Sequence, residues 1–414
     1  MLSRRGFFHS SIAGVGAAVA SSGLFLPRCL ADDSEEGEAA TPRGAPASLF
    51  LTWRTDPTTT MVIQWIGPGA SMTALEYSFF GADDWKGAVI TTKDYPDTDL
   101  KVYRCELTGL APGSEYAFRL SESAPPQRFR TMPAKSSDVI QFVSGGDCGT
   151  GSHAVATNIL AARQEPYFAL LGGDLAYDNG RSPETFLKFL ENYSLHMIDP
   201  QGRLIPMLSC LGNHEVNGGY NGQRSAASHY LSVFDGLYSD TSYGALDFGD
   251  YLSLVLLDTG HLSPIEGEQT TWLRTTLTER RDRPHLIVAN HVPAYPSYRK
   301  ESTGEENRKH WCPLFEELGV DVVLEHHDHT FKRTHPMLGG MRDQHGIPYL
   351  GDGSWGKLRP LKEPEERPYL ARYSESYHVA VHRLEDENRF HVALTDSGKV
   401  ADVCSSFGKR PLRQ

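Results

Sequence analysis

Short runs of alternating apolar and polar residues fill the chain from about residue 45 to 133. The clearest runs predict strands at 61–65, 74–79 and 116–120, and segments rich in Gly, Pro and Asp separate them. Alternation with a period of two places every second side chain on the same face of a sheet. The pattern therefore predicts an antiparallel β-sandwich over residues 45–133.

From residue 138 to about 400 the hydrophobic pattern is different, because continuous apolar runs alternate with stretches of helical periodicity. We expect strands at 139–143, 168–171, 206–211, 252–257, 285–289 and 320–324, and helices near 153–163, 183–197, 266–280 and 307–318. Strand–helix alternation predicts layered α/β packing, with mixed β-sheets flanked by helices. Residues 401–414, which end in a basic run, are expected to form a solvated tail.

The first 31 residues have the pattern of an export signal. Arg4 and Arg5 precede two phenylalanines, and an uncharged stretch of 15 residues rich in Ala, Gly and Val follows at 12–26. A spanning helix needs about 20 apolar residues, so no stable membrane span is expected. The arginine pair resembles a twin-arginine signal, which the twin-arginine export machinery recognises. A chance arginine pair before an ordinary secretory signal is the alternative.

We therefore expect an exported protein, periplasmic or extracellular, with a flexible linker at 32–44. The chain of 414 residues has 40 Lys and Arg against 52 Asp and Glu, a formal charge of −12. That balance argues against nucleic acid as a general partner. Five cysteines lie beyond the signal, too widely spaced for a zinc knuckle or a dense disulfide framework. We expect buried thiols for most of them, and a single disulfide stays open.

Five short polar clusters follow predicted strands of the second region. Each lies where an apolar run ends, which is where α/β sheets place ligand-binding loops. The clusters supply hard oxygens and imidazoles, a donor set suited to Fe, Zn or Mn in a catalytic site. In chain order they are Gly146-Asp147-Cys148-Gly149, Gly173-Asp174-Leu175-Ala176-Tyr177, Gly212-Asn213-His214-Glu215, Asn290-His291 and His327-Asp328-His329.

This order of clusters resembles the calcineurin-like metallophosphoesterases, and the tyrosine of the second cluster resembles their purple acid phosphatase branch. A fibronectin type III-like domain often precedes the catalytic domain in that branch. Here Leu110–Tyr116 resembles the tyrosine corner of such modules, in which the phenol bonds to nearby backbone, and Trp65 lies on an early strand. The resemblance implies a metallophosphoesterase α/β sandwich at 138–400, preceded by a fibronectin type III-like domain at 45–133. We expect that domain to be a structural cap, with a substrate or carbohydrate binder as the alternative.

The resemblance also implies two metal ions about 3.5 Å apart. The family's ligands fall into two sets joined by Asp174, which would bridge both metals: Asp147, Tyr177 and His329 for the first, and Asn213, His291 and His327 for the second. A phenolate is a hard anionic donor that favours Fe(III) at the first position. The second set suits a divalent ion, namely Fe, Zn or Mn.

The resemblance implies hydrolysis of small phosphomonoesters by in-line attack of a metal-bound hydroxide on phosphorus. His214 would be catalytic and would protonate the leaving oxygen, while Glu215 would orient its ring. One alternative is a phosphodiesterase or nucleotidase on the same scaffold. The other is a non-catalytic cell-surface binding protein with a vestigial metal site.

Two positions depart from the family pattern. Glycine usually precedes the first histidine of the last cluster, but here His326 takes that place. We expect its side chain to face outward, and the alternatives are that it shifts the loop or acts as an additional metal ligand. Plant-type members carry histidines a little beyond the fourth cluster, where this chain has Tyr298-Arg299-Lys300-Glu301. Arg299 and Lys300 are therefore candidates for contacts with substrate phosphate, and solvated surface charge is the alternative for either one.

Overall fold

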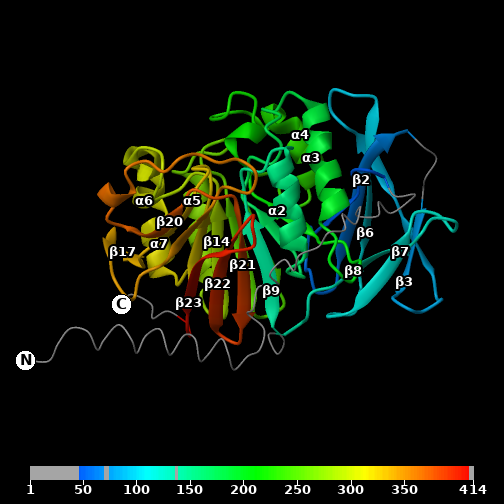
Figure 1. Cartoon of the computed structure of the whole chain (residues 1–414). Helices are drawn as coiled ribbons and strands as arrows, with labels where there is room; N and C mark the ends of the chain where they lie inside the picture. The colour runs from blue at the N-terminus through cyan, green and yellow to red at the C-terminus, as the bar shows by residue number, and fades with distance from the viewer. Residues whose placement is uncertain (1–45, 70–73, 136–138, 410–414) are drawn as a thin grey trace, which may run out of the picture.

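A computed structural model of the chain describes residues 46–69, 74–135 and 139–409 (Figure 1). The predicted export signal and the linker at 32–44 lie outside these residues. Within them, no helix combines the length and the apolar character that a membrane crossing needs. The five cysteines are free thiols, and Cys105, Cys148, Cys210 and Cys312 are buried, as expected for most of them.

Two four-stranded antiparallel sheets form the N-terminal domain, as the alternating pattern predicts. The strand orders are β1-β2-β6-β5 and β4-β3-β7-β8. The strands are β1 (Phe50–Thr52), β2 (Met61–Pro68), β3 (Ala74–Phe79), β4 (Lys86–Val89), β5 (Thr91–Asp94), β6 (Leu100–Leu107), β7 (Glu115–Arg119) and β8 (Gln127–Arg130). The Ala111 N–H donates to the Tyr116 hydroxyl at 2.9 Å, which confirms the predicted tyrosine corner. The closer assignment to fibronectin type III stays a prediction.

Two mixed sheets form the second domain, also as predicted. In the six-stranded sheet, with order β11-β10-β9-β21-β22-β23, the first three strands run parallel to one another. Its strands are β9 (Ile140–Gly145), β10 (Ala169–Leu171), β11 (Met207–Ser209), β21 (His378–Glu385), β22 (Asn388–Thr395) and β23 (Val400–Ser406). The presence of β23 contradicts the predicted tail over residues 401–406, because Arg389 to Leu394 of β22 pair with it. Residues 410–414 lie outside the described residues.

The seven-stranded sheet has the order β12-β13-β14-β15-β19-β16-β20, and β13, β14, β15 and β19 are parallel. Its strands are β12 (Gly244–Phe248), β13 (Leu252–Leu257), β14 (His285–Asn290), β15 (Val322–Glu325), β16 (Phe331–Thr334), β19 (Tyr349–Asp352) and β20 (Leu370–Ser374). A small hairpin pairs β17 (Met337–Leu338) with β18 (Met341–Arg342). Every residue of β13 and β14 is buried, which explains their continuous apolar sequence.

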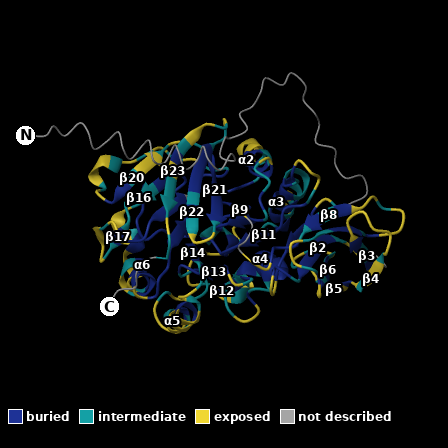
Figure 2. Cartoon of the chain, turned by 90° about the horizontal axis from the view of Figure 1, so that it is seen from below, coloured by how far each residue is buried: buried dark blue, intermediate teal, exposed yellow. Residues whose placement is uncertain are grey.

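Helices cover the two sheets on their outer faces (Figures 1 and 2). They are α2 (Ser152–Ala162), α3 (Pro183–His196), α4 (Ser228–Phe234), α5 (Glu268–Arg280), α6 (Glu305–His310) and α7 (Cys312–Glu317). The single helix predicted near 307–318 is two helices that meet at Trp311. Pro313 has no N–H to continue the hydrogen bonding of α6, and its ring is tolerated only in the first turn of a new helix.

Candidate metal centre

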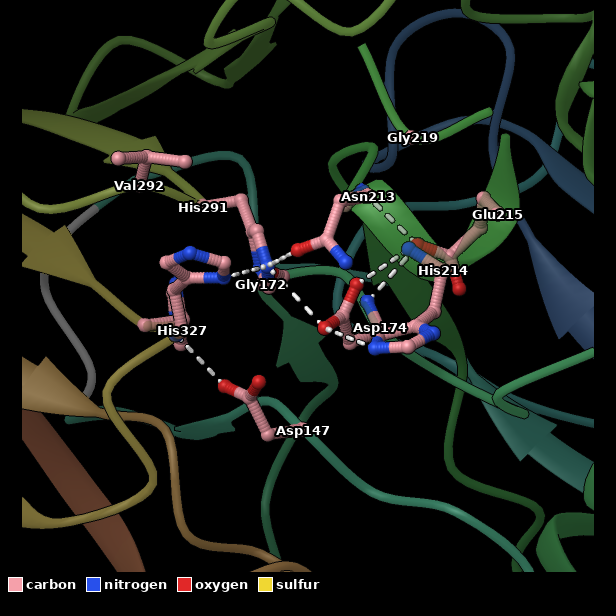
Figure 3. Close-up of polar contacts among 12 residues, drawn as sticks. Asp147, Gly172, Asp174, Asn213, His214, Glu215, Gly219, His291, Val292 and His327 are labelled. Atoms are coloured by element: carbon pink, nitrogen blue, oxygen red, sulfur yellow. Dashed lines mark hydrogen bonds and ion pairs between the residues drawn. The ribbon is translucent and has the colours of Figure 1, made fainter. Parts of the chain in front are cut away.

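The five polar clusters lie at the carboxyl ends of buried strands in both sheets of the second domain. Strands β9, β10 and β11 lead to Asp147, Asp174 and Asn213, whereas β14 and β15 lead to His291 and His327. Because parallel strands end at the same edge of a sheet, the loops of each sheet converge. Figure 3 shows side chains from the loops of both sheets pointing toward one another.

Several of these loops hold a left-handed backbone at residues other than glycine. Such conformations cost about 1–2 kcal/mol each and persist only where the surroundings impose them. Five candidate ligands have them, with φ of 56° at Asp147, 53° at Asp174, 64° at Tyr177, 72° at His327 and 58° at His329. Backbone strain thus gathers at the clusters that the sequence singled out, as it does at functional sites.

The first three candidate ligands bring their donor atoms together as a triangle. The Tyr177 hydroxyl lies 3.2 Å from Asp147 Oδ1 and 3.0 Å from His329 Nε2. His329 Nε2 is in turn 3.0 Å from Asp147 Oδ1. An oxygen anion, a phenol and an imidazole therefore face a common point from three separate loops.

A second group of donors surrounds the Nε2 atom of His291. Asn213 Oδ1 lies 3.2 Å from it, His327 Nδ1 lies 3.0 Å from it and Asp174 Oδ2 lies 3.3 Å from it. The other ring nitrogen of His291 contacts the Gly172 carbonyl at 2.8 Å, so Nδ1 donates its proton there. Nε2 is thereby the ring nitrogen that faces the other donors (Figure 3).

Asp174 links the two groups. Its Oδ1 accepts a hydrogen bond from the His214 backbone N–H at 2.8 Å. Its Oδ2 is buried and, apart from His291 Nε2 at the ion-pair distance of 3.3 Å and His214 Nε2 at 3.9 Å, meets no donor in the part of the chain that the structure describes. A buried carboxylate oxygen without a donor is costly unless a cation lies beside it. One ligand atom each from Asp147, Asp174, His291 and His327 lies within 4.8 Å of all the others, so these residues fit a metal ion.

Burial and mutual charge shift the pKa values of these groups in opposite directions. Burial alone would lower the pKa of His291, but the adjacent Asp174 carboxylate raises it to about 9. Burial, and then the charge of His291, lowers the pKa of His327 well below its usual value. Burial, and then the charges of Asp147 and Asp174, raises the pKa of the Tyr177 phenol. A phenolate at Tyr177 therefore requires a cation beside its oxygen.

Two family models match the chain in tandem. Residues 140–331 match the calcineurin-like phosphoesterases, and residues 46–143 match the N-terminal domain of purple acid phosphatases. The chain belongs to the calcineurin-like phosphoesterases of the purple acid phosphatase type. It is accordingly an enzyme, a metal-dependent phosphoric ester hydrolase of the acid phosphatase type.

Named relatives and a solved structure agree with this assignment. Purple acid phosphatase 21 of Arabidopsis thaliana is 25% identical over 307 residues, which cover 70% of this chain and 67% of the relative. Acid phosphatase type 7 of Homo sapiens is 25% identical over 418 residues, which cover 89% and 90%. A purple acid phosphatase from seeds of yellow lupin (Lupinus luteus) superposes with a TM-score of 0.71 at 17% identity, covering 87% of this chain and 74% of that one. The last likeness shows the fold.

His214 lies at the exposed side of the centre of this phosphoesterase. Its side chain is 32% exposed, and its Nε2 lies 3.9 Å from Asp174 Oδ2. Its ring lies 4.2 Å from that of Tyr177, and its Nδ1 contacts Asn179 Oδ1. Asn179, not Glu215, is therefore the partner of the ring. Sequence reasoning missed Asn179, because an asparagine in a loop carries no signal of which side chain it meets.

The expected role of Glu215 as the residue that orients His214 is wrong. Its buried carboxylate accepts three backbone hydrogen bonds instead, from Gly212 and Asp174 at 2.8 Å each and from Leu175 at 2.7 Å. Glu215 thus ties the loop of the third cluster to that of the second. Because three backbone hydrogen bonds converge on one side chain, the geometry of both loops depends on it.

The outward orientation expected for His326 is also wrong. Its side chain is 1% exposed, and its Nδ1 contacts the Asn290 carbonyl at 2.9 Å. The ring fills the space left by two glycines, since a Cβ atom on Gly172 would lie 1.9 Å from it and one on Gly146 would lie 2.8 Å from it. The imidazole fits in the interior of the domain because Gly146 and Gly172 have no side chains.

The candidate phosphate contacts differ in position. The Arg299 guanidinium donates to the His327 carbonyl at 3.4 Å and lies 3.7 Å from Asp328 Oδ1, at the edge of the second donor group. The exposed side chain of Lys300 makes no hydrogen bond or ion pair within the described part of the chain. Sequence reasoning missed Lys357, whose Nζ lies 4.6 Å from the centre of the Tyr177 ring and whose backbone N–H donates to the Asp147 carbonyl at 3.0 Å.

Proposed function

We propose that this phosphoesterase is an exported, dinuclear-metal phosphatase that hydrolyses small phosphomonoesters. The observation that carries the proposal is the pair of donor groups joined by the Asp174 carboxylate, whose Oδ2 lies 3.3 Å from His291 Nε2. Asp147, Tyr177 and His329 would hold Fe(III), and Asn213, His291 and His327 would hold a divalent ion. Two bound metal ions supply charge neutralisation to the phosphate and lower the pKa of the attacking water. The pattern of residues 1–31 supports export.

The protein's own side chains would then position the ester and handle the proton of the leaving group. His214 is the imidazole nearest solvent at the centre, and its contact with Asn179 fixes the orientation of the ring. Hydrolysis of a phosphomonoester requires up to ~10²¹-fold acceleration, on the order of 28 kcal/mol. A general acid contributes only ~10²–10⁴-fold, or about 3–5 kcal/mol. His214 therefore assists a reaction that charge neutralisation dominates.

Turnover of a nitrophenyl phosphomonoester and of the matched bis-nitrophenyl phosphodiester tests the proposal. We expect the metal-loaded protein to hydrolyse the monoester with the higher kcat/KM. A preference for the diester would favour a phosphodiesterase or nucleotidase on the same scaffold. No turnover of either ester by the fully metal-loaded protein would contradict a catalytic role.

Replacement of Tyr177 by phenylalanine tests the assignment of Fe(III) to the first donor group. A phenolate on Fe(III) gives a charge-transfer band in the visible, so the iron-loaded protein should be pink to purple. We expect Tyr177→Phe to lose this band while iron remains bound through Asp147 and His329, as measured by visible absorption and elemental analysis of the same samples. A protein that contains no iron and turns over with Mn or Zn alone would contradict the assignment.

Arg299 and Lys300 offer a matched pair for testing phosphate contacts. Arg299 lies against the His327 loop, so it can meet a phosphate bound at the metals, whereas Lys300 faces solvent. A hydrogen bond to a charged group contributes about 1.5–3 kcal/mol, so Arg299→Ala should raise KM by about 10-fold or more. Steady-state kinetics should show little change for Lys300→Ala. If both variants change KM equally, neither residue makes a specific contact with the phosphate.

A further inference from the structure

Helix α4 lies between the N-terminal sandwich and the metal-ligand loops. It runs beside β2 and β6 in both views of the molecule (Figures 1 and 2). From the sandwich, Gln64 Nε2 donates to the Val233 carbonyl at 2.8 Å. Arg104 and Lys93 each pair with Asp235, the residue that ends the helix, at 2.5 Å. These ion pairs and the hydrogen bond from Gln64 thus hold the helix against the sandwich. The Arg104 side chain is only 12% exposed at this boundary.

One side chain of α4 connects the sandwich with the loop of Tyr177. His229 is fully buried, and its Nδ1 lies 3.0 Å from Oδ2 of Asp178, the residue after Tyr177. Its Nε2 lies 3.4 Å from Oδ2 of Asp97 in the turn between β5 and β6, and the ring of Tyr95 packs 5.8 Å away. A buried imidazole between two carboxylates therefore spans the domain boundary.

The same segment holds the strand that leads to Asn213 and His214. The Tyr230 and Tyr238 hydroxyls both donate to the Ser209 carbonyl, at 3.0 and 2.5 Å. Ser209 is the last residue of β11, from which the third cluster follows directly. Both tyrosines are nearly or fully buried, so these bonds fix the end of the strand against α4 and the turn that follows it.

We propose that the N-terminal sandwich positions the loops of Tyr177 and of Asn213 and His214 by clamping α4 between the domains. This inference rests on the proposed function, since it treats those residues as ligands and acid. Tyr177 holds a strained left-handed backbone, which persists only if its surroundings impose it. The contact of His229 with Asp178 supplies that constraint at the Tyr177 loop. The bonds of Tyr230 and Tyr238 to Ser209 hold the strand that leads to Asn213 and His214. The domain is then a part of the active-site scaffold, and its role goes beyond the structural cap expected from the sequence.

Two arginines of the sandwich provide a matched test, because both cross to the catalytic domain at different places. Arg104 contacts Asp235 at the end of α4, whereas Arg128 donates to the Gln201 carbonyl, on a loop without candidate ligands. The backbone N–H groups of Arg181 and Ser182 donate to the Asp178 carbonyl and report on the Tyr177 loop. Hydrogen exchange of these two amides in the full chain is the first readout. The position of the visible band of the iron-loaded protein is the second.

We expect Arg104→Met to accelerate exchange at Arg181 and Ser182 on the order of 10-fold and to shift the band. Arg128→Met should accelerate exchange near Gln201 only and leave the band unchanged. His229→Gln, which replaces the imidazole facing Asp178 and Asp97 by a single flexible amide, should reproduce the effect of Arg104→Met. Should Arg104→Met fail to fold, Lys93→Met removes the other partner of Asp235 from a side chain that is 39% exposed.

The inference is overturned if Arg104→Met and His229→Gln leave the exchange of Arg181 and Ser182 at the wild-type rate. It is equally overturned if Arg128→Met changes that exchange as much as Arg104→Met does, because a general loss of stability would then explain both. Exchange requires neither metal nor turnover. If the wild-type protein is inactive but Arg104→Met still accelerates exchange at Arg181 and Ser182, the proposed function is wrong and the coupling between the sandwich and the Tyr177 loop stands.

Discussion

Asp174→Asn should abolish binding of both metals and lower kcat/KM on the order of 10³-fold or more. The substitution keeps the size of the side chain and the bond from the His214 N–H, but it removes the single negative charge between the two donor groups. Two cations a few ångströms apart repel each other strongly unless an anion lies between them. Without the metals, the transition state loses several kcal/mol of charge stabilisation, and the rate falls accordingly. Elemental analysis and steady-state kinetics on the same samples measure both effects.

A second buried acid supplies the control for this substitution. Asp258 is also fully buried and accepts backbone hydrogen bonds, from His261 at 2.7 Å and from Ser263 at 2.8 Å, but it belongs to neither donor group. Asp258→Asn should therefore cost stability, measured by thermal unfolding, and retain two metals per chain. Two metals per chain and normal turnover in Asp174→Asn would contradict the bridging assignment.

The grouping of the candidate ligands within each sheet is predictable because it follows from strand ends. Apolar runs such as Leu252–Leu257 and His285–Asn290 are legible in the sequence as buried strands, and the structure places both near their expected bounds. Polar residues that directly follow such runs must lie at one edge of a parallel sheet. That rule holds without any knowledge of side-chain contacts, so it groups Asp147, Asp174 and Asn213 at one sheet and His291 and His327 at the other. It does not predict that the loops of the two sheets meet, which in the sequence only the family resemblance implies.

Contacts that depend on space between loops were not predictable in the same way. His326 turns inward because Gly146 and Gly172 leave room for an imidazole, and those glycines belong to loops more than 150 residues away in the sequence. Glu215 bonds to the backbone of Asp174 and Leu175 instead of its neighbour His214. A backbone N–H carries no residue-specific signal, so the sequence offers no means to pair it with a particular carboxylate.

Secondary structure deviated where local and tertiary effects compete. The sequence predicts one helix near 307–318, but Pro313 lies in the first turn of α7 and interrupts it. The buried Trp311 lies at the junction of the two helices, and its indole N–H donates to Thr270. At the C-terminus, Val400–Ser406 pairs with β22 although its exposed edge carries little apolar pattern. A strand whose stability comes from its partner leaves only a weak trace in its own sequence.

His214→Ala should distinguish substrates by the leaving group, since His214 is proposed to protonate the leaving oxygen. An alkoxide has a high pKa and cannot depart unprotonated, whereas a nitrophenolate is stable enough to leave alone. Loss of the acid should therefore lower kcat/KM by up to ~10²–10⁴-fold on an alkyl phosphate and distinctly less on a nitrophenyl phosphate. The exposed position of the ring, 32% accessible beside the buried donors, suits contact with a leaving group at the mouth of the centre.

Metal occupancy and one neighbouring variant make this result specific. His214 donates its backbone N–H to Asp174, and alanine keeps that bond, so His214→Ala should retain both metals. Asn179→Ala keeps the imidazole but removes the contact that orients it. It should therefore show the same dependence on the leaving group, with a smaller decrease in kcat/KM. Equal losses on both esters at full metal occupancy would mean that His214 orients the phosphate or polarises the nucleophile, and the assignment as the acid would then be wrong.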